Sequence, residues 1–209
     1  MHDLSSQIQE AVRVLKKGGI VAYPTDTVYG LGASMQSAGA VERIFAVKSR
    51  PRQMALPLLV GSVAHIEELA EHISPAARCL IEAFLPGALT LVLRASGLVP
   101  TYLRAKEGTI ALRIPGHPVP LALIAGIGAA IVGTSANLSG KPSSATAEEV
   151  RSQFGDKVDL IIDGSGCGGK ESTIVDVTGD TFIVLRSGAV TEKEIERVCG
   201  GVKAVNGGL

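Results

Sequence analysis

The feature that most constrains the fold of this chain is an alternation of short apolar runs with amphipathic helical segments. The apolar runs are rich in Val, Ile and Leu and predict buried strands at 20–23, 56–60, 89–93, 109–114 and 130–134. The segments between them predict helices at about 4–17, 40–48, 63–71, 75–85 and 118–125. This alternation is typical of an α/β fold.

Three further apolar runs near the end of the chain are separated mainly by turn residues. They comprise residues 160–162, 173–177 and 182–185. Their spacing favours antiparallel pairing. Capping boxes beginning at Thr146 and Thr191 predict one helix before these runs and another after them. We therefore expect a single domain over residues 4–200, built on a mixed sheet with flanking helices, and a flexible tail at 201–209.

The overall composition narrows the function classes. Lys and Arg total 20, as do Asp and Glu, so the chain lacks the basic field of a dedicated nucleic-acid binder. Its three cysteines are far apart and form no CxxC pair, which argues against a disulfide framework or a zinc site. No apolar run is long and unbroken enough to span a bilayer. We expect a cytoplasmic protein without membrane association or a protein-bound metal.

A glycine-rich segment at 164–169 matches the GxGxxG pattern of dinucleotide-binding proteins and also begins a P-loop pattern. Both patterns require a helix after the glycines, because the helix N-terminus binds the phosphate. Here residues 173–175 are typical of a strand, and Glu171 stands where a P-loop needs Ser or Thr. The segment is therefore interpreted either as a loop that closes over another site or as a surface turn.

Four polar patches follow or interrupt the apolar strands, where α/β sheets place their ligands. The loop at 24–32 offers hydroxyls, a carboxylate and glycines, and fits either a small polar ligand or a capped turn. Residues 48–52 carry three cations. In an extended segment Lys48 and Arg50 would point to one side and could bind phosphate oxygens. The alternative is a solvated basic turn.

The other two patches lie on later strands. Arg113 interrupts the strand at 109–114 and needs a partner, either an internal carboxylate or a carboxylate ligand. The strand at 130–134 leads into a loop with Ser135 and Asn137, and no histidine lies in a recognisable triad order with Ser135. The patches together offer cations, hydroxyls and an amide without an evident general base. That inventory suits phosphoryl or nucleotidyl transfer.

Six segments occur in a fixed order along almost the whole chain. They are PTDTVYGLG, the Lys48-x-Arg50 pair, GTIALRIPGHP, TSANLSGKPS with Ser135-x-Asn137, ESTIVD and IVLRSGAV. Together they resemble the YrdC-type threonylcarbamoyl-AMP synthases. The resemblance implies a twisted, mixed parallel and antiparallel α/β sheet with a large concave groove. It also implies synthesis of threonylcarbamoyl-AMP and pyrophosphate from L-threonine, bicarbonate and ATP, for t6A modification next to the anticodon of tRNA.

The resemblance further implies roles for individual residues. The expected threonine contacts are Thr27, Arg113, Ser135 and Ser172. The expected ATP contacts are Lys48, Arg50, Thr109, Asn137 and Arg186. Lys48, Arg50, Ser135 and Asn137 form the expected catalytic group. Mg²⁺ would arrive with ATP, and downstream t6A transferase proteins would take the product.

The chain departs from the family pattern at Leu56, where many relatives have Asn, at Gly61, near the position of their His, and at Ala145, where relatives often have Thr. The residues that would make one ATP contact and one threonine contact near Leu56 and Gly61 are therefore not assigned. Larger relatives carry a C-terminal domain, which we do not expect here. Two other functions remain as alternatives: an RNA-binding module of the same fold, for tRNA or double-stranded RNA, and a carbamoyl-transfer domain.

Overall fold

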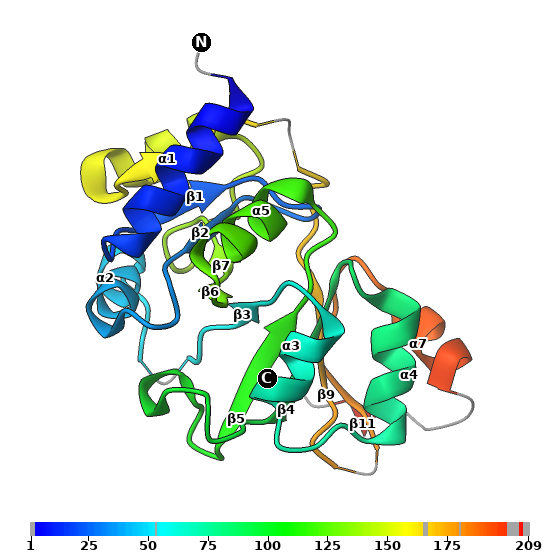
Figure 1. Ribbon diagram of the computed structural model, residues 1–209. Helices are drawn as coiled ribbons and strands as arrows, with labels where there is room; N and C mark the ends of the chain where they lie inside the picture. Colours follow the sequence, from blue (N-terminus) through cyan, green and yellow to red (C-terminus); the bar gives the residue numbers. More distant parts are fainter. Residues whose placement is uncertain (1–2, 53, 165–166, 180, 200–204, 207–209) are drawn as a thin grey trace.

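The computed structural model describes residues 3–52, 54–164, 167–179, 181–199 and 205–206, which form two β-sheets with helices around them (Figure 1). The helices are α1 Leu4–Lys16, α2 Ala38–Lys48, α3 Val63–Leu69, α4 Pro75–Phe84, α5 Pro118–Ile127, α6 Ala147–Phe154 and α7 Glu192–Cys199. The strands are β1 Val21–Tyr23, β2 Gly30–Gly32, β3 Leu58–Leu59, β4 Leu89–Arg94, β5 Thr109–Arg113, β6 Ile131–Val132, β7 Thr134–Ser135, β8 Leu160–Ile161, β9 Thr173–Asp176, β10 Ile183–Arg186 and β11 Val205–Asn206.

Both sheets combine parallel and antiparallel pairs. The larger has the strand order β11-β10-β9-β4-β5-β3-β6, and the smaller has β7-β2-β1-β8. Strand β4 is antiparallel to β5 and parallel to β9, while β1 is antiparallel to β2 and parallel to β8. An isolated bridge between Ser34 and Ile131 joins the two sheets just after β2. The predicted α/β fold, with mixed pairing and flanking helices, is confirmed.

Two details of the sequence-based prediction are wrong. The run at 160–162 does not pair with the later strands, because α6 carries the chain across to the far edge of the smaller sheet. There β8 runs parallel to β1, and the predicted antiparallel pairing holds only for β9 and β10. Residues 30–32, predicted to be loop, form the strand β2.

The glycines of β2 are explained by the tyrosine opposite them. Tyr23 is fully buried and is the register partner of Gly30 across the β1–β2 pair. A Cβ atom on Gly30 would lie 2.6 Å from the Tyr23 ring. A Cβ atom on Gly32 would lie 2.5 Å from the carbonyl oxygen of Val132. The glycines therefore mark a strand that other groups approach closely, and not a turn.

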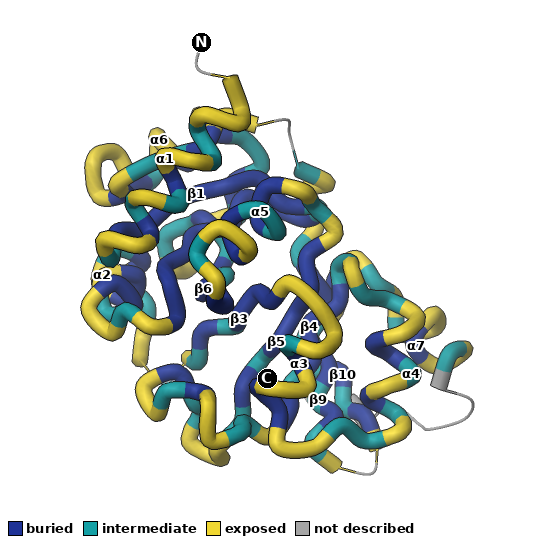
Figure 2. The backbone as a smooth tube through the Cα atoms, viewed as in Figure 1, coloured by how far each residue is buried: buried dark blue, intermediate teal, exposed yellow. Residues whose placement is uncertain are grey.

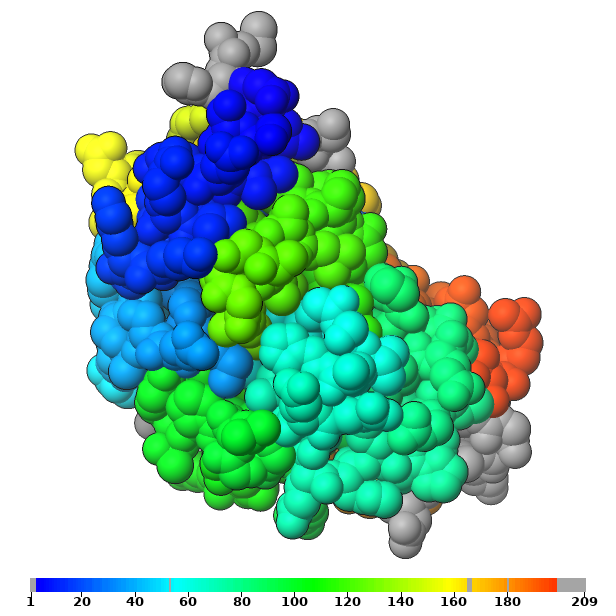
Figure 3. Space-filling model, in the orientation of Figure 1, coloured from blue at the N-terminus to red at the C-terminus, as the bar shows by residue number. Residues whose placement is uncertain are grey.

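Buried aliphatic side chains form two clusters. The larger spans both sheets and includes Leu31 of β2, Leu91 of β4 and Leu112 of β5. The smaller lies beneath α1 and α5 and includes Leu15 and Leu123. Figure 2 shows the buried strands inside and the exposed turns of the helices outside, and Figure 3 shows α1 and α5 side by side on the surface.

The C-terminal segment is described in part. Val205–Asn206 form β11, which pairs in parallel with β10. The other residues of the predicted tail, and residue 200 at the expected domain boundary, lie outside the described residues. The flexibility of the tail stays a prediction.

The close approach at Gly32 predicts a large effect on stability. Gly32→Ala should lower the free energy of unfolding by about 1–3 kcal/mol, because the new methyl group meets the backbone carbonyl of Val132 and the ring of Tyr23. The control is Gly39→Ala in α2, where an added Cβ meets nothing within 4 Å. It should be neutral or stabilise by up to about 1 kcal/mol. Urea unfolding of both variants measures the difference, and equal values would contradict the packing described.

Candidate functional site

Lys48 lies at the end of α2, and its side chain is buried. Ser49 adopts a left-handed conformation with φ of 51° and ends the helix. The Lys48 ammonium donates to the carbonyl oxygens of Ser135 at 2.5 Å and Asn137 at 2.6 Å, and to Asn137 Oδ1 at 3.2 Å. All three ammonium protons thus have acceptors. The hypothesis of an extended Lys48–Arg50 segment is wrong, because Ser49 turns the chain sharply.

The charge of Lys48 is held in an unfavourable environment. Burial, aided by the neighbouring Arg50 cation, lowers the pKa of Lys48 to about 8, and the Glu171 carboxylate opposes this shift. Burial and the Arg186 cation also lower the pKa of Arg50, and Glu171 again acts in the opposite direction. These cations therefore share one electrostatic environment, as expected for a site that receives an anion.

Arg50 is anchored by its own loop. Its Nε and one terminal nitrogen donate to the carbonyl oxygens of Met54 and Ala55, each at 3.1 Å. A guanidinium has five N–H donors, so these contacts leave three for a ligand. Arg52 differs from Arg50 because it is exposed and forms an ion pair with Glu42. Of the cations in the basic segment, Lys48 and Arg50 are the two held toward the interior.

Ser135 and Asn137 stabilise the loop after β7. Ser135 Oγ donates to Asn137 Oδ1 at 2.7 Å, and Asn137 Nδ2 donates to the carbonyl oxygen of Lys141 at 2.6 Å. The Asn137 side chain therefore links the Lys48 ammonium to the loop backbone. The structure brings Lys48, Ser135 and Asn137 into direct contact, as their predicted grouping requires.

Arg113 ends β5 and is 7% exposed. Its guanidinium donates to Asp26 Oδ1 at 2.7 Å, to Thr27 Oγ1 at 3.0 Å and to the carbonyl oxygen of Gly87 at 2.8 Å. Of the two partners considered for Arg113, the structure therefore shows the internal carboxylate. These contacts use three of the five N–H donors, so two remain for a ligand carboxylate.

Arg186 ends β10 and contacts the residues that precede β9. It donates to the carbonyl oxygen of Ser172 at 2.8 Å and to Ser172 Oγ at 3.2 Å, and it forms an ion pair with Glu171 Oε2 at 2.6 Å. The other oxygen of Glu171 accepts from the Ser143 hydroxyl. Ser172 Oγ also shares a hydrogen bond with Thr90 Oγ1 at 2.9 Å. The structure thus brings together Ser172, an expected threonine contact, and Arg186, an expected ATP contact.

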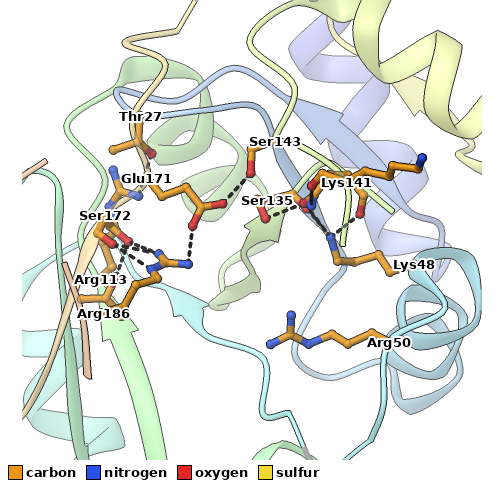
Figure 4. A network of polar contacts seen from close by, with 12 residues as sticks. Thr27, Lys48, Arg50, Arg113, Ser135, Lys141, Ser143, Glu171, Ser172 and Arg186 are labelled. Atoms are coloured by element: carbon orange, nitrogen blue, oxygen red, sulfur yellow. Dashed lines mark hydrogen bonds and ion pairs between the residues drawn. The ribbon is translucent and has the colours of Figure 1, made fainter. Parts of the chain in front are cut away.

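Glu171 and Ser143 belong to this network, although sequence reasoning did not select them. Glu171 was considered only as a residue that breaks the P-loop pattern. The available signal was its place directly before Ser172, in a segment already assigned to the site. Figure 4 shows the Glu171 carboxylate between Arg186 and Ser143, and the guanidinium groups of Arg50 and Arg186 pointing toward one another.

The glycine-rich segment packs against the loop after β1. The backbone N–H of Gly169 donates to the carbonyl oxygen of Thr27 at 2.8 Å, and a Cβ atom on Gly168 would lie 3.1 Å from the carbonyl oxygen of Asp26. Strand β9 follows, with no helix N-terminus to bind phosphate. Gly168 and Gly169 therefore lie against the Asp26–Thr27 backbone, and closure of the segment over the site stays a prediction.

Thr109 lies apart from this network. It begins β5, whereas Arg113 ends it, and four residue steps in a strand span roughly 13 Å. A cavity of about 190 Å³ adjoins the Arg50 loop and the turn before Thr109, without reaching the predicted site residues. It is lined by Phe45, Arg52, Ala55, Leu56, Tyr102, Leu103, Arg104, Ala105 and Lys106. Leu56, which stands where many relatives have Asn, lines this cavity with an apolar side chain.

The described part of the chain offers neither a cluster of metal ligands nor a membrane-spanning helix. Its His, Cys, Asp and Glu side chains nowhere gather in a group of three or more that could hold a metal ion. Its helices are all too short or too polar to cross a membrane.

Comparison with known proteins identifies the family. Residues 13–188 match the model of the Sua5/YciO/YrdC family, which carries the description telomere recombination. The chain is 39% identical over 204 residues to threonylcarbamoyl-AMP synthase of Bacillus subtilis, covering 96% of this chain and 59% of that protein. It is 43% identical over 197 residues to a putative threonylcarbamoyl-AMP synthase of Mycobacterium tuberculosis, covering 94% of this chain and 90% of that one.

A solved structure agrees with these sequence matches. The crystal structure of Pyrococcus abyssi Sua5 complexed with L-threonine superposes with a TM-score of 0.92 at 39% identity, covering 98% of this chain and 60% of that one. The fold is thus that of a YrdC-like domain, with the site at the junction of its two sheets. The chain belongs to the Sua5/YciO/YrdC family, and it spans about three fifths of the length of the Bacillus and Pyrococcus relatives.

The depressed pKa of Lys48 predicts a pH-dependent stability. The folded protein holds this proton with a pKa of about 8, against 10.5 for an ordinary lysine. Between these values the unfolded chain binds more protons, so the free energy of unfolding should rise with pH, by on the order of 1–3 kcal/mol. Below pH 8 both states are protonated, and this contribution is constant.

Urea unfolding from pH 7 to 10.5 measures this rise, with Lys48→Met as the control that lacks the titrating group. Relative to that of Lys48→Met, the free energy of unfolding of wild type should increase as the pH increases. Parallel pH profiles for the two proteins would contradict the depressed pKa.

Proposed function

We propose that this chain is a threonylcarbamoyl-AMP synthase, a nucleotidyltransferase that acts on L-threonine, bicarbonate and ATP. The observation that carries the proposal is the convergence of two groups of side chains. One group, around Lys48 and Arg50, offers cations to phosphates. The other, around Arg113 and Ser172, offers a cation and hydroxyls to an amino acid. The names of the relatives and the threonine in the Pyrococcus complex support this reading.

Threonine fits the second group by charge and by hydrogen bonding. The two free N–H donors of Arg113 suit a carboxylate, which can accept two parallel hydrogen bonds from a guanidinium. Thr27 and Ser172 lie beside Arg113 and Arg186 and can bond the threonine hydroxyl. Ser135, on β7, is proposed as a further contact.

The triphosphate of ATP fits the first group. Arg50 has three N–H donors free, and Arg186 is directed toward Arg50 from the opposite side (Figure 4). Lys48 holds the loop of Ser135 and Asn137 in place and can reach a phosphate by exchanging its 3.2 Å contact to Asn137 Oδ1. Thr109, at the far end of β5, is proposed to contact the nucleoside side of ATP.

The proposed reaction requires no nucleophile from the protein. The amine of threonine combines with bicarbonate to give a carbamate and water. A carbamate oxygen then attacks the α-phosphorus, forming a new P–O bond while the bond to the β-phosphate oxygen breaks and pyrophosphate leaves. The protein would contribute by holding the two substrates in line and by neutralising charge on the phosphates.

The substrates and partners complete the proposal. Mg²⁺ is proposed to enter as part of the ATP complex, since it favours phosphate oxygens and water over a cage of protein ligands. The product would pass to proteins that modify tRNA, in the cytoplasm. Direct contact with the phosphates of tRNA is proposed to use the cations of Lys48 and Arg50.

The experiment that tests the proposal is pyrophosphate release by the purified chain. With L-threonine, bicarbonate and Mg·ATP present, we expect continuous release, and omission of threonine or bicarbonate should abolish it. Mass spectrometry should detect threonylcarbamoyl-AMP in equal amount. Pyrophosphate release that does not depend on threonine would contradict the proposal.

Arg50→Ala tests the nucleotide side of the site in the same assay. Loss of a charge-assisted contact of about 1.5–3 kcal/mol should lower kcat/KM for ATP by roughly tenfold to a hundredfold. Arg78→Ala is the control, because Arg78 is an exposed cation paired with Glu67 on the surface. Its activity should stay within about twofold of wild type. Full activity of Arg50→Ala would remove Arg50 from the site.

A further inference from the structure

Glu171 is the carboxylate nearest to the cations assigned to the nucleotide. Its side chain is only one-third exposed and bridges two elements, since one oxygen pairs with Arg186 at 2.6 Å and the other accepts from Ser143. Arg186 comes from the end of β10 and Ser143 from the loop after β7. Figure 4 shows the carboxylate in the space between these segments, on the side that faces Lys48 and Arg50.

The negative charge of Glu171 acts on cations on both sides of this space. It opposes the lowering of the pKa of Lys48 and of Arg50, so it stabilises both cations as well as Arg186. Asp26, a further carboxylate close to the site, is bound to Arg113. Glu171 thus balances part of the positive charge while no ligand is bound.

A polyphosphate in this space would meet both the cations and Glu171. Phosphate oxygens and a carboxylate seek the same donors, the N–H groups of Arg186 and the hydroxyl of Ser143. Like charges at such short range repel each other, and each additional phosphate increases the repulsion. The Glu171 carboxylate must therefore release Arg186 and Ser143 before a phosphate can accept hydrogen bonds from them.

We propose that Glu171 is a built-in competitor for phosphate: it occupies the Arg186–Ser143 anion position in the free protein and is displaced when a polyphosphate binds. It weakens the binding of polyphosphates, which must displace it, and leaves the binding of ligands without phosphate unchanged. This inference rests on the proposed function, since it assigns the same space to the phosphates of ATP.

The test is equilibrium binding of ATP, inorganic pyrophosphate and adenosine to wild type and to Glu171→Gln. Glutamine keeps the size of the side chain but lacks the charge; its amide oxygen can accept from Arg186, and its amide nitrogen can donate to the Ser143 hydroxyl. Glu171→Gln should bind ATP and pyrophosphate roughly tenfold more tightly, while adenosine binding stays the same. Calorimetry at low ionic strength measures the three affinities.

Two further variants separate local competition from other effects. Glu171→Asp keeps the charge and should show no such gain. Glu82→Gln removes one negative charge from the exposed face of α4 and should leave all three affinities unchanged. Thermal unfolding of each variant shows that the fold is kept.

The outcomes distinguish this inference from the function on which it rests. Unchanged or weaker ATP binding by Glu171→Gln would overturn the competitor role and would indicate that Glu171 only positions Arg186. An equal gain for adenosine, or the same gain in Glu82→Gln, would also overturn it. If wild type bound neither ATP nor pyrophosphate, both the inference and the proposed function would fail.

Discussion

The buried ammonium of Lys48 is the interaction on which the rest of the site depends. It joins the end of α2 to the carbonyl oxygens of the loop after β7, segments separated by almost ninety positions in the chain. A buried cation is costly unless all its protons are bonded, and here they are. The left-handed Ser49 ends α2 at the point where Lys48 can reach this loop. The same turn sends Arg50 toward Arg186.

The two sheets bring the remaining side chains to this point. The parallel pairing of β4 with β9 sets Ser172 beside Thr90, and the antiparallel β9–β10 pair returns Arg186 to Ser172. At the end of β5, Arg113 reaches the loop after β1. The site therefore contains cations from three different strands or helices, balanced in the free protein by Asp26 and Glu171.

Much of the fold followed from the sequence because its apolar runs have clear periods and its helices have clear caps. The segments of α1, α5 and β5 were predicted within a few residues. The strand β2 was missed because its two glycines are typical of a turn, and only the ring of Tyr23 opposite them explains their place. The partner of β8 was missed because pairing over more than a hundred positions leaves no local signal.

The site was predictable to a similar degree. The grouping of Lys48 with Ser135 and Asn137 was anticipated, and the structure shows their contacts. The partner of Arg113 could not be chosen from sequence, because a carboxylate at Asp26 and a ligand carboxylate satisfy the same guanidinium. Glu171 was overlooked because its importance comes from Arg186 and Ser143, which are distant in the chain and close only after folding.

In the proposed function, the polar network around Lys48 and Arg113 receives ATP and threonine side by side. A crystal structure of the chain with L-threonine and a non-hydrolysable Mg·ATP analogue tests it most directly. We expect the triphosphate between Lys48, Arg50 and Arg186, and the threonine carboxylate on the two free donors of Arg113. A nucleotide bound elsewhere, or threonine without contact to Arg113, would contradict this arrangement of the substrates.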